Sequence, residues 1–451
     1  MRAVTHDRGA RRLLNPATPQ AAGGRPHRRL AGAGRVERAR WRPARLLPCL
    51  GLLGAAAAQA QVEPDYFART PPYPVYTPPD VTQYNLKVGN LSAQLRGDVQ
   101  FEVNDNINLD QYNPQGDFSI GPFVGVGFIW PYAKDHVLQL DLGIGYRWYL
   151  QHPELDFVSI APNSHLDYTV SLGNVRVTAH DRFSIEVDPM SLGVLGGAAG
   201  QVASFRRFVN AAGFITEWQA SRKLSLFSGY DYGLDRSLNA NFRELDNYTH
   251  TAYGGLNYAL SAFLTAGVMG SYTATRYFEH IQNDGDSYSF GPTFTWKLSK
   301  VLTATAAAGY TASVYSRTGI VLDDSSYHGP TYQLTLEHTL SPRTSQSLQV
   351  GQSVGLGFED NYTKTTDIQY GISTRLTKAI TLNAIIAYED LVGSGLFSDH
   401  AHRYLLYLGS GYQFTKYWSA GVSYSFGLRE SQLPGWGYTQ NRLTVDLMRR
   451  F

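Results

Sequence analysis

Residues Leu138–Tyr149 read LQLDLGIGYRWY, with an apolar side chain at every second position. The even positions hold leucine, isoleucine, tyrosine and tryptophan, whereas most odd positions hold polar residues or glycine. Successive side chains of a β-strand point to opposite faces, so this stretch predicts a strand with one apolar and one polar face. The same alternation recurs in Leu348–Phe358 and Trp418–Leu428.

Turn signals divide the chain after residue 81 into a regular series of hairpins. Short turns near residues 222, 261, 299, 342, 378 and 416 are 36 to 43 residues apart, which predicts two strands per repeat. We expect an all-β, antiparallel, up-and-down barrel of about eighteen strands. Sixteen is the second choice, because Gly173-Asn174 is either a two-residue turn or a bulge inside one strand. The predicted strands are 92–105, 118–130, 136–150, 164–172, 175–188, 204–219, 222–234, 247–259, 262–277, 287–298, 301–316, 327–339, 345–359, 363–376, 379–391, 401–414, 417–430 and 438–450.

Strand length and the placement of charge indicate a membrane barrel. Runs of about 12–15 residues are ~40–50 Å long, enough to cross an outer membrane when tilted. The polar face carries too many charges for the dry core of a soluble barrel. We therefore expect the apolar face to contact lipid and the polar face to line a wet lumen. The predicted lumen-lining residues are Arg96, Asp98, Glu102, Asp141, Arg147, Arg176, His180, Arg182, Glu186, Glu337, Glu359, Asp367, Arg375 and Asp446.

Composition excludes several other classes of protein. Charged residues make up 17 % of the 451 residues, and mean hydropathy is −0.25 with no long stretch free of polar groups. A helical membrane protein and a disordered chain are both disfavoured. Residues 1–60 carry twelve arginines and two acids, so the rest of the chain is acidic. The basic excess therefore gives no support for nucleic-acid binding.

The first eighty residues read as export and linker segments. Residues 46–58 (LLPCLGLLGAAAA) form an apolar run that follows several arginines and precedes Ala58-Gln59-Ala60. This pattern predicts a secretory signal within residues 1–60, cleaved after Ala60. The single cysteine, Cys49, falls inside it. Residues 61–80 hold six prolines and predict an extended periplasmic linker before a barrel over residues 81–451.

A family resemblance adds to this interpretation. The final strand ends at Phe451 and resembles the assembly signal of bacterial outer-membrane proteins, although Arg449 departs from the usual apolar residue. The strings EVNDNI (102–107) and HDRFSIEVDP (180–189) are similar to the β-barrel porin 2 group of outer-membrane proteins. The resemblance implies outer-membrane lipid, periplasmic chaperones and the barrel-assembly machinery as partners. It brings no catalytic or ligand residues and no cofactor.

No constellation of residues predicts an enzyme or a metal site. His180, Asp181 and Ser184 include the residue types of a hydrolytic triad, but adjacent strand residues cannot converge on one point. The acidic loop 283–286 lacks the calcium-loop pattern. We expect neither catalysis nor a bound metal.

The long, uncharged stretch 189–203 (PMSLGVLGGAAGQVA) differs from the other loops. We expect it to fold into or over the lumen and narrow it, through Pro189, Leu192, Leu195 and Gln201.

Three functions remain open from the sequence. A channel that passes small polar solutes by diffusion fits the mixed charges of the predicted lining. A polysaccharide exporter is the second, because inward-facing Tyr149 and Tyr407 could stack on sugar rings. A structural or adhesive barrel that acts through its loops is the third. We do not expect a receptor with an internal plug domain, because the segment before the first strand is too short to hold one.

Overall fold

The computed structural model describes residues 84–162, 164–187, 205–358, 360–395 and 398–451, apart from the side chain of Glu186. The predicted signal and linker, residues 1–80, lie outside them. Among the described residues, no helix is long and apolar enough to cross a membrane. The described elements are twenty strands and two short 3-10 helices.

The strands have these bounds: β1 Leu86–Val88, β2 Leu91–Asn104, β3 Asp117–Ala133, β4 His136–Tyr149, β5 Phe157–Ile160, β6 His165–Leu172, β7 Val175–Glu186, β8 Arg207–Gln219, β9 Leu224–Ser237, β10 Asn247–Ala259, β11 Leu264–Tyr277, β12 Gly285–Lys297, β13 Leu302–Tyr315, β14 Tyr327–Ser341, β15 Thr344–Leu356, β16 Tyr362–Arg375, β17 Ile380–Gly393, β18 His400–Gln413, β19 Trp418–Ser431 and β20 Tyr438–Arg450. The 3-10 helices are η3 (Pro153–Leu155) and η5 (Ala240–Leu245).

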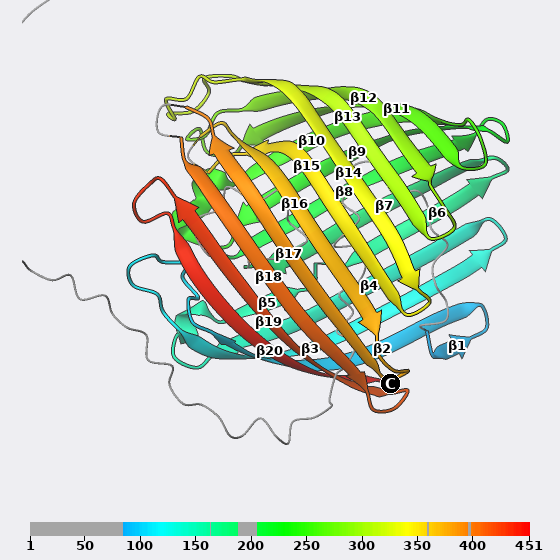
Figure 1. The fold of residues 1–451 in the computed structure, drawn as a ribbon, viewed down its shortest axis with the longest axis horizontal. Helices are drawn as coiled ribbons and strands as arrows, with labels where there is room; N and C mark the ends of the chain where they lie inside the picture. Colours follow the sequence, from blue (N-terminus) through cyan, green and yellow to red (C-terminus); the bar gives the residue numbers. More distant parts are fainter. Residues whose placement is uncertain (1–83, 163, 188–204, 359, 396–397) are drawn as a thin grey trace, which may run out of the picture. The chain divides into compact units, whose positions relative to one another are not determined.

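The sheet closes on itself, and every described neighbour pair is antiparallel. The last strand, β20, pairs with β2 from Arg96↔Arg450 to Asn104↔Arg442, which completes the circuit (Figure 1). β1 pairs with β2 alone, and β5 and β6 together fill one place between β4 and β7. The described residues therefore form a wall of eighteen strand positions, which confirms the predicted fold and strand number.

The connections alternate between short and long. The short ones, such as 134–135, 173–174 and 342–343, lie together at what we call the turn end of the barrel. The long ones lie at the opposite end, the loop end; they include 105–116, 238–246, 278–284, 316–326, 357–361, 394–399 and 432–437. Consecutive strands of an up-and-down barrel reverse direction, so two ends of different character follow from the hairpin repeat.

The region around Gly173-Asn174 settles the strand count. Leu172 pairs with Val175, and Gly173 has a positive φ of 64°, so the two residues form a tight hairpin turn. A positive φ at the first central position alone is the type II′ pattern, which favours glycine there. The preceding wall strand is longer than the predicted range 164–172, because it starts in β5 at Phe157 and is interrupted before β6.

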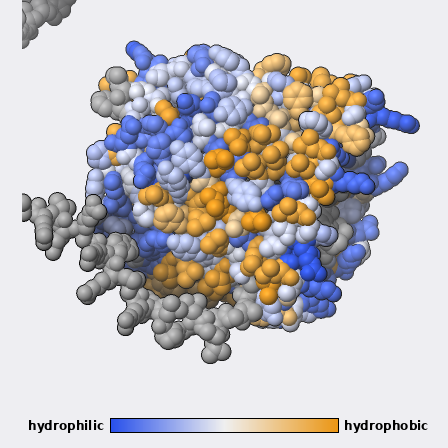
Figure 2. All heavy atoms as spheres, viewed as in Figure 1, coloured by the Kyte–Doolittle hydropathy of each residue, from blue (hydrophilic) through white to orange (hydrophobic). Residues whose placement is uncertain are grey.

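The two faces of the wall differ as a membrane barrel requires. Large apolar side chains stand exposed on the outer face; examples are Val124, Ile144 and Ile386. Among the described residues, buried polar or charged side chains outnumber buried hydrophobic ones by more than two to one. A soluble protein shows the reverse. Figure 2 shows hydrophobic residues gathered over the middle of the wall and hydrophilic ones toward its ends.

Aromatic side chains mark both ends of the apolar outer face. Trp130, Trp218 and Trp296 are exposed near the turn end, and Trp148 and Tyr404 are exposed near the loop end. Rings with one apolar and one polar side favour the membrane–water interface. Two aromatic belts at opposite ends of the outer face are the arrangement expected of an apolar band between two headgroup zones.

Candidate functional site

One part of the inner face, on β2–β4 and β7–β9, is charged and tightly paired. Arg96 on β2 forms an ion pair of 2.9 Å with Asp141 on β4. Glu102 accepts a 3.4 Å contact from Arg147, which also donates to Ser119 at 3.0 Å. His180 Nε2 lies 2.7 Å from Asp231 Oδ1.

These contacts place several of the predicted lining residues. Arg176 pairs with Glu217 at 3.4 Å, and Arg182 is exposed on β7. Glu337 and Arg375 are exposed near the turn end of β14 and β16. The side chain of Glu186, the residue Glu359 and the loop 189–203 with Pro189, Leu192, Leu195 and Gln201 lie outside the described residues.

Three predicted carboxylates stand apart from the ion pairs. Asp98, Asp367 and Asp446 are on β2, β16 and β20, and the last two are more than nine-tenths buried. Asp98 Oδ1 and Asp367 Oδ2 are buried without a hydrogen-bond partner in the described part of the chain. A buried carboxylate oxygen of this kind is costly in a dry core, so a wet lumen suits it better.

Another part of the inner face, on β12–β16, is built mainly from hydroxyl, amide and glycine groups. Thr311 on β13 lies 3.3 Å from Ser289 and 2.8 Å from Thr331, on the strands at either side. Ser287 and Ser313 are 2.9 Å apart. Such cross-strand hydroxyl pairs stabilise adjacent strands without charge. The lumen therefore has a charged side and a mainly neutral, hydrogen-bonding side.

The loop 105–116 folds inward against the inner wall. Leu109 is 3 % exposed and belongs to a buried cluster with Ala387 on β17, Leu405 on β18 and Tyr438 on β20. Asn106 fixes the loop to β20 through two hydrogen bonds. Its side-chain amide donates to Thr439 O at 3.0 Å, and its backbone carbonyl accepts from Gln440 Nε2 at 2.6 Å. An inward loop was predicted, but at residues 189–203 rather than here.

The tip of this loop is held in an unfavourable backbone conformation. Leu109 has a φ of +55°, and it is the only non-glycine residue with positive φ among those described. Bulky residues rarely adopt this region, so surrounding contacts must maintain it. Asn106 bonds twice to Asp110, and the Asp110 carboxylate accepts the backbone N–H groups of Tyr112 and Asn113. Hydrogen bonds from Asn113 and Tyr112 lower the pKa of Asp110, so it remains ionised near neutral pH.

Two buried ion pairs lie beside this loop on the inner face. Arg403 on β18 contacts Glu389 on β17 at 2.5 Å, and Arg429 on β19 contacts Asp399 at 2.6 Å. Arg403 and Glu389 are 1 % and 0 % exposed. Arg429 also donates to Trp436 O in the loop 432–437, so this pair joins the wall to the loop end.

Four aromatic side chains connect loops from distant parts of the circuit. Phe205, before β8, stacks on Phe242 of η5 with ring centroids 4.3 Å apart. Phe242 lies 6.4 Å from Phe358, which contacts Trp436 edge-to-face at 5.9 Å. These residues stand in loops next to β8, β10, β16 and β20. The chain of rings therefore bridges the loop end, and we call it the aromatic bridge.

Polar contacts lock a further group of loops together. Asn283 donates to Asp323 O at 2.9 Å and to Asn361 Oδ1 at 2.9 Å. The Asp323 carboxylate accepts from Asn361 N and from the Ser394 hydroxyl. Burial acts to raise the pKa of Asp323, but hydrogen bonds from Ser325, Ser394 and Asn361 outweigh it and hold the pKa below its usual range.

The sequence predicts the alternation of polar and apolar residues along the strands, but it does not predict which charged residues form ion pairs. Alternation places Glu389, Arg403 and Arg429 on strands, but only the register shows that Glu389 and Arg403 meet. The contact of Arg429 with Asp399 depends on the fold of the loop before β18. The inward loop carries no periodic signal. Its one local signal is the run of asparagine and aspartate in 104–113, residue types that form side-chain-to-backbone turns.

Comparisons with known proteins give structural likeness alone. No family model matches the sequence, and no curated protein matches it. The resemblance to the β-barrel porin 2 group therefore stays a prediction. Among solved structures, the chain is similar to Pseudomonas aeruginosa OccK5 (OpdH), at 13 % identity and a TM-score of 0.48, over 81 % of this chain and 99 % of that one.

Two further similar structures were solved with small molecules. P. aeruginosa OccK2 (OpdF) in complex with glucuronate is 9 % identical, with a TM-score of 0.47, over 80 % of this chain and 98 % of that one. P. aeruginosa OpdK with vanillate is 9 % identical, with a TM-score of 0.45, over 80 % and 99 %. At these values, function has to be inferred from the chain's own residues.

Proposed function

We propose that this chain is a channel of the bacterial outer membrane that passes small polar solutes by diffusion. One observation carries the proposal: a closed wall exposes its apolar side chains outward and buries charged and polar side chains inward. Lipid contacts the apolar side chains of the outer face, and water and permeating solutes can form hydrogen bonds with the polar side chains of the inner face. The predicted signal in residues 1–60 and the linker 61–80 support export to that membrane. Phe451, directly after β20, supports insertion by the barrel-assembly machinery.

The lining supports weak selectivity between anions and cations. Most charges of the charged side are held in pairs of opposite sign, such as Arg96 with Asp141. Paired charges leave little net potential along the path. The predicted lining residues, from Arg96 to Asp446, are proposed to contact the solutes and none to catalyse a reaction. We also propose that the loop 189–203 narrows the lumen, in addition to the inward loop 105–116.

The test is single-channel conductance of the processed chain, residues 61–451, in a planar bilayer. We expect stable steps that grow in proportion to salt concentration, with similar permeability for potassium and chloride. A barrel that inserts and shows heat-modifiable mobility yet never conducts would overturn the proposal. That outcome would favour a structural or adhesive role.

The aromatic bridge favours a second candidate function, which is export of a polysaccharide. Sugar rings stack on aromatic faces, and Phe242, Phe358 and Trp436 together offer several faces at the loop end. Tyr149 and Tyr407, at inward-facing positions of β4 and β18, are predicted to add to them. Concentration-dependent block of the conductance by soluble oligosaccharides would favour this function, and unimpeded current would favour simple diffusion.

A further inference from the structure

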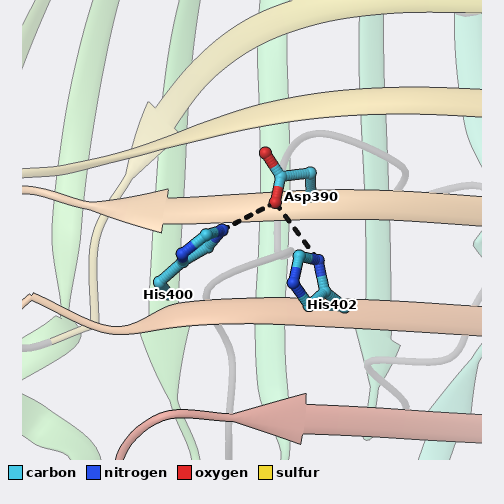
Figure 3. Close-up of side chains that lie close together, drawn as sticks. All are labelled: Asp390, His400 and His402. Atoms are coloured by element: carbon cyan, nitrogen blue, oxygen red, sulfur yellow. Dashed lines mark hydrogen bonds and ion pairs between the residues drawn. The ribbon is translucent and has the colours of Figure 1, made fainter.

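Three metal-ligating side chains gather on the outer face of the wall, away from the lumen (Figure 3). Asp390 is on β17, and His400 and His402 are on β18. They alternate with the inward-facing Glu389, Leu391, Ala401 and Arg403, all of which are almost fully buried. The cluster is therefore separate from the lining described above.

The sheet register explains why these three side chains meet. Asp390 is directly paired with His402, and His400 is paired with Val392, two residues further along β17. Directly opposed residues have Cβ atoms about 4.5–5.5 Å apart, and diagonal neighbours about 7–8 Å, within reach of an imidazole. The spacing His-Ala-His puts both rings on one face of β18.

The ligand atoms already converge. His400 Nε2 lies 2.8 Å from Asp390 Oδ1, and His402 Nδ1 lies 3.2 Å from the same oxygen. All three ligand atoms fall within 4.8 Å of one another. In a tetrahedral zinc site with bonds of ~2.0–2.1 Å, two ligand atoms are about 3.3 Å apart. Small rotations of the side chains are enough to admit an ion.

We propose that Asp390, His400 and His402 bind a divalent transition-metal ion of the zinc class on the outer surface of the barrel. Two imidazoles and one carboxylate suit zinc, copper or nickel better than calcium or magnesium, which prefer an all-oxygen shell. Three protein ligands leave at least one coordination position for water or an anionic group. The site does not depend on the proposed channel activity.

The surroundings of the cluster favour a cation. Glu430 on β19 is exposed and pairs directly with His402, so a second carboxylate lies beside the three ligands. The charge of a divalent ion offsets those of Asp390 and Glu430. His400 is the first residue of β18, which places the cluster close to the loop end of the wall. Charged groups are tolerated there because the cost of facing lipid falls toward the interface.

Two neighbouring side chains act on the ligands in different ways. The Tyr388 hydroxyl lies 3.0 Å from His402 Nδ1, the atom that would bind the ion, so it competes with the metal. Gln432 Nε2 lies 3.4 Å from His400 Nδ1, the ring nitrogen that would not bind the ion. With the ion on Nε2, the proton of the ring is on Nδ1. The Gln432 amide can orient the His400 ring once its oxygen, in place of its nitrogen, faces Nδ1 and accepts that hydrogen bond.

The test is zinc titration of the untagged, processed chain in detergent, followed by isothermal calorimetry and by competition with a chromogenic chelator. We expect one zinc ion per chain, retained in excess calcium. His402→Ala and Asp390→Asn should each abolish stoichiometric binding. Gln432→Ala should weaken it about 10–100-fold, and Tyr388→Phe should leave it equal or tighter.

His250→Ala is the matched control. His250 also lies on the outer face near the loop end, but its ring neighbours are Tyr230, Tyr232 and Tyr248. Heat-modifiable mobility verifies folding of each variant. With copper, nitrogen couplings from two imidazoles should appear in the electron paramagnetic resonance spectrum of the parent chain and be lost in His402→Ala. Zinc binding that is absent from the folded parent chain, or lost equally in His250→Ala, would overturn the proposal.

Discussion

Arg403 and Glu389 form a directly paired couple on neighbouring strands, 2.5 Å apart and almost completely enclosed. Each side chain carries the opposite charge that offsets the cost of burying the other away from water. An isolated buried charge is far more costly than the pair, so the two side chains depend on each other. Beside them, the buried apolar cluster of Leu109 fixes the loop 105–116 to the wall.

Removing one partner of that pair should destabilise the barrel strongly. In Glu389→Gln, the buried Arg403 loses the carboxylate that it contacts, and we expect a loss of about 3–5 kcal/mol in the free energy of unfolding. Urea unfolding in lipid vesicles measures it. Asp324→Asn is the control, because Asp324 and Arg317 form an exposed pair and such pairs contribute little. Equal stability of Glu389→Gln and the parent chain would contradict the prediction.

Releasing the inward loop should change the current through the pore. Leu109→Ala removes the apolar anchor while the unfavourable backbone conformation remains, so the loop should detach from the wall part of the time. We expect greater open-channel noise and a higher mean conductance in planar bilayers. Tyr112→Ala, in the same loop but 71 % exposed, should behave like the parent chain. The loop is no constriction if Leu109→Ala also gives the parent's trace.

Breaking the aromatic bridge should admit larger molecules from one side only. Phe358 is one of the two inner rings of the bridge, with contacts to both Phe242 and Trp436, so Phe358→Ala separates Trp436 from the other rings. We expect larger polyethylene glycols to reduce conductance when they are added at the loop end, with no change at the turn end. Phe290→Ala, on the outer face, is the control. A size cut-off that shifts at both ends, or at neither, would count against the bridge.

The locked loops should open in acid. Because the folded-state pKa of Asp323 is below its usual value of about 3.9, its ionised form stabilises the lock above that value. The stabilisation is lost as the pH falls through the lower, folded-state pKa. We expect protease resistance of the loops to be constant from neutral pH to about 4 and to fall below it. In Asp323→Asn, which cannot ionise, the loops should be more susceptible throughout, and a parent-like profile would refute the assignment.

Alternation and turn spacing were sufficient to predict the wall. The ranges predicted for two strands, 247–259 and 438–450, coincide with β10 and β20. Period-two patterning is local, so a single sequence reveals it. The interruption between β5 and β6 was missed because residues 151–163 lack clear alternation. Partner choice depends on long-range register, so the Arg403–Glu389 pair and the Asp390–His402 cluster could not be inferred from neighbouring residues.

The barrel can close only if β2 pairs with β20. These strands are more than 330 residues apart in sequence, yet their pairing alone joins the two ends of the sheet. A chain that lacked the residues of β20 would present two rows of unpaired N–H and C=O groups, β2 on one side and β19 on the other. In hydrocarbon each such group costs several kcal/mol, and in water each row invites pairing with another chain. Premature termination within the last fifteen codons should therefore yield an aggregating polypeptide, rather than a slightly narrower pore.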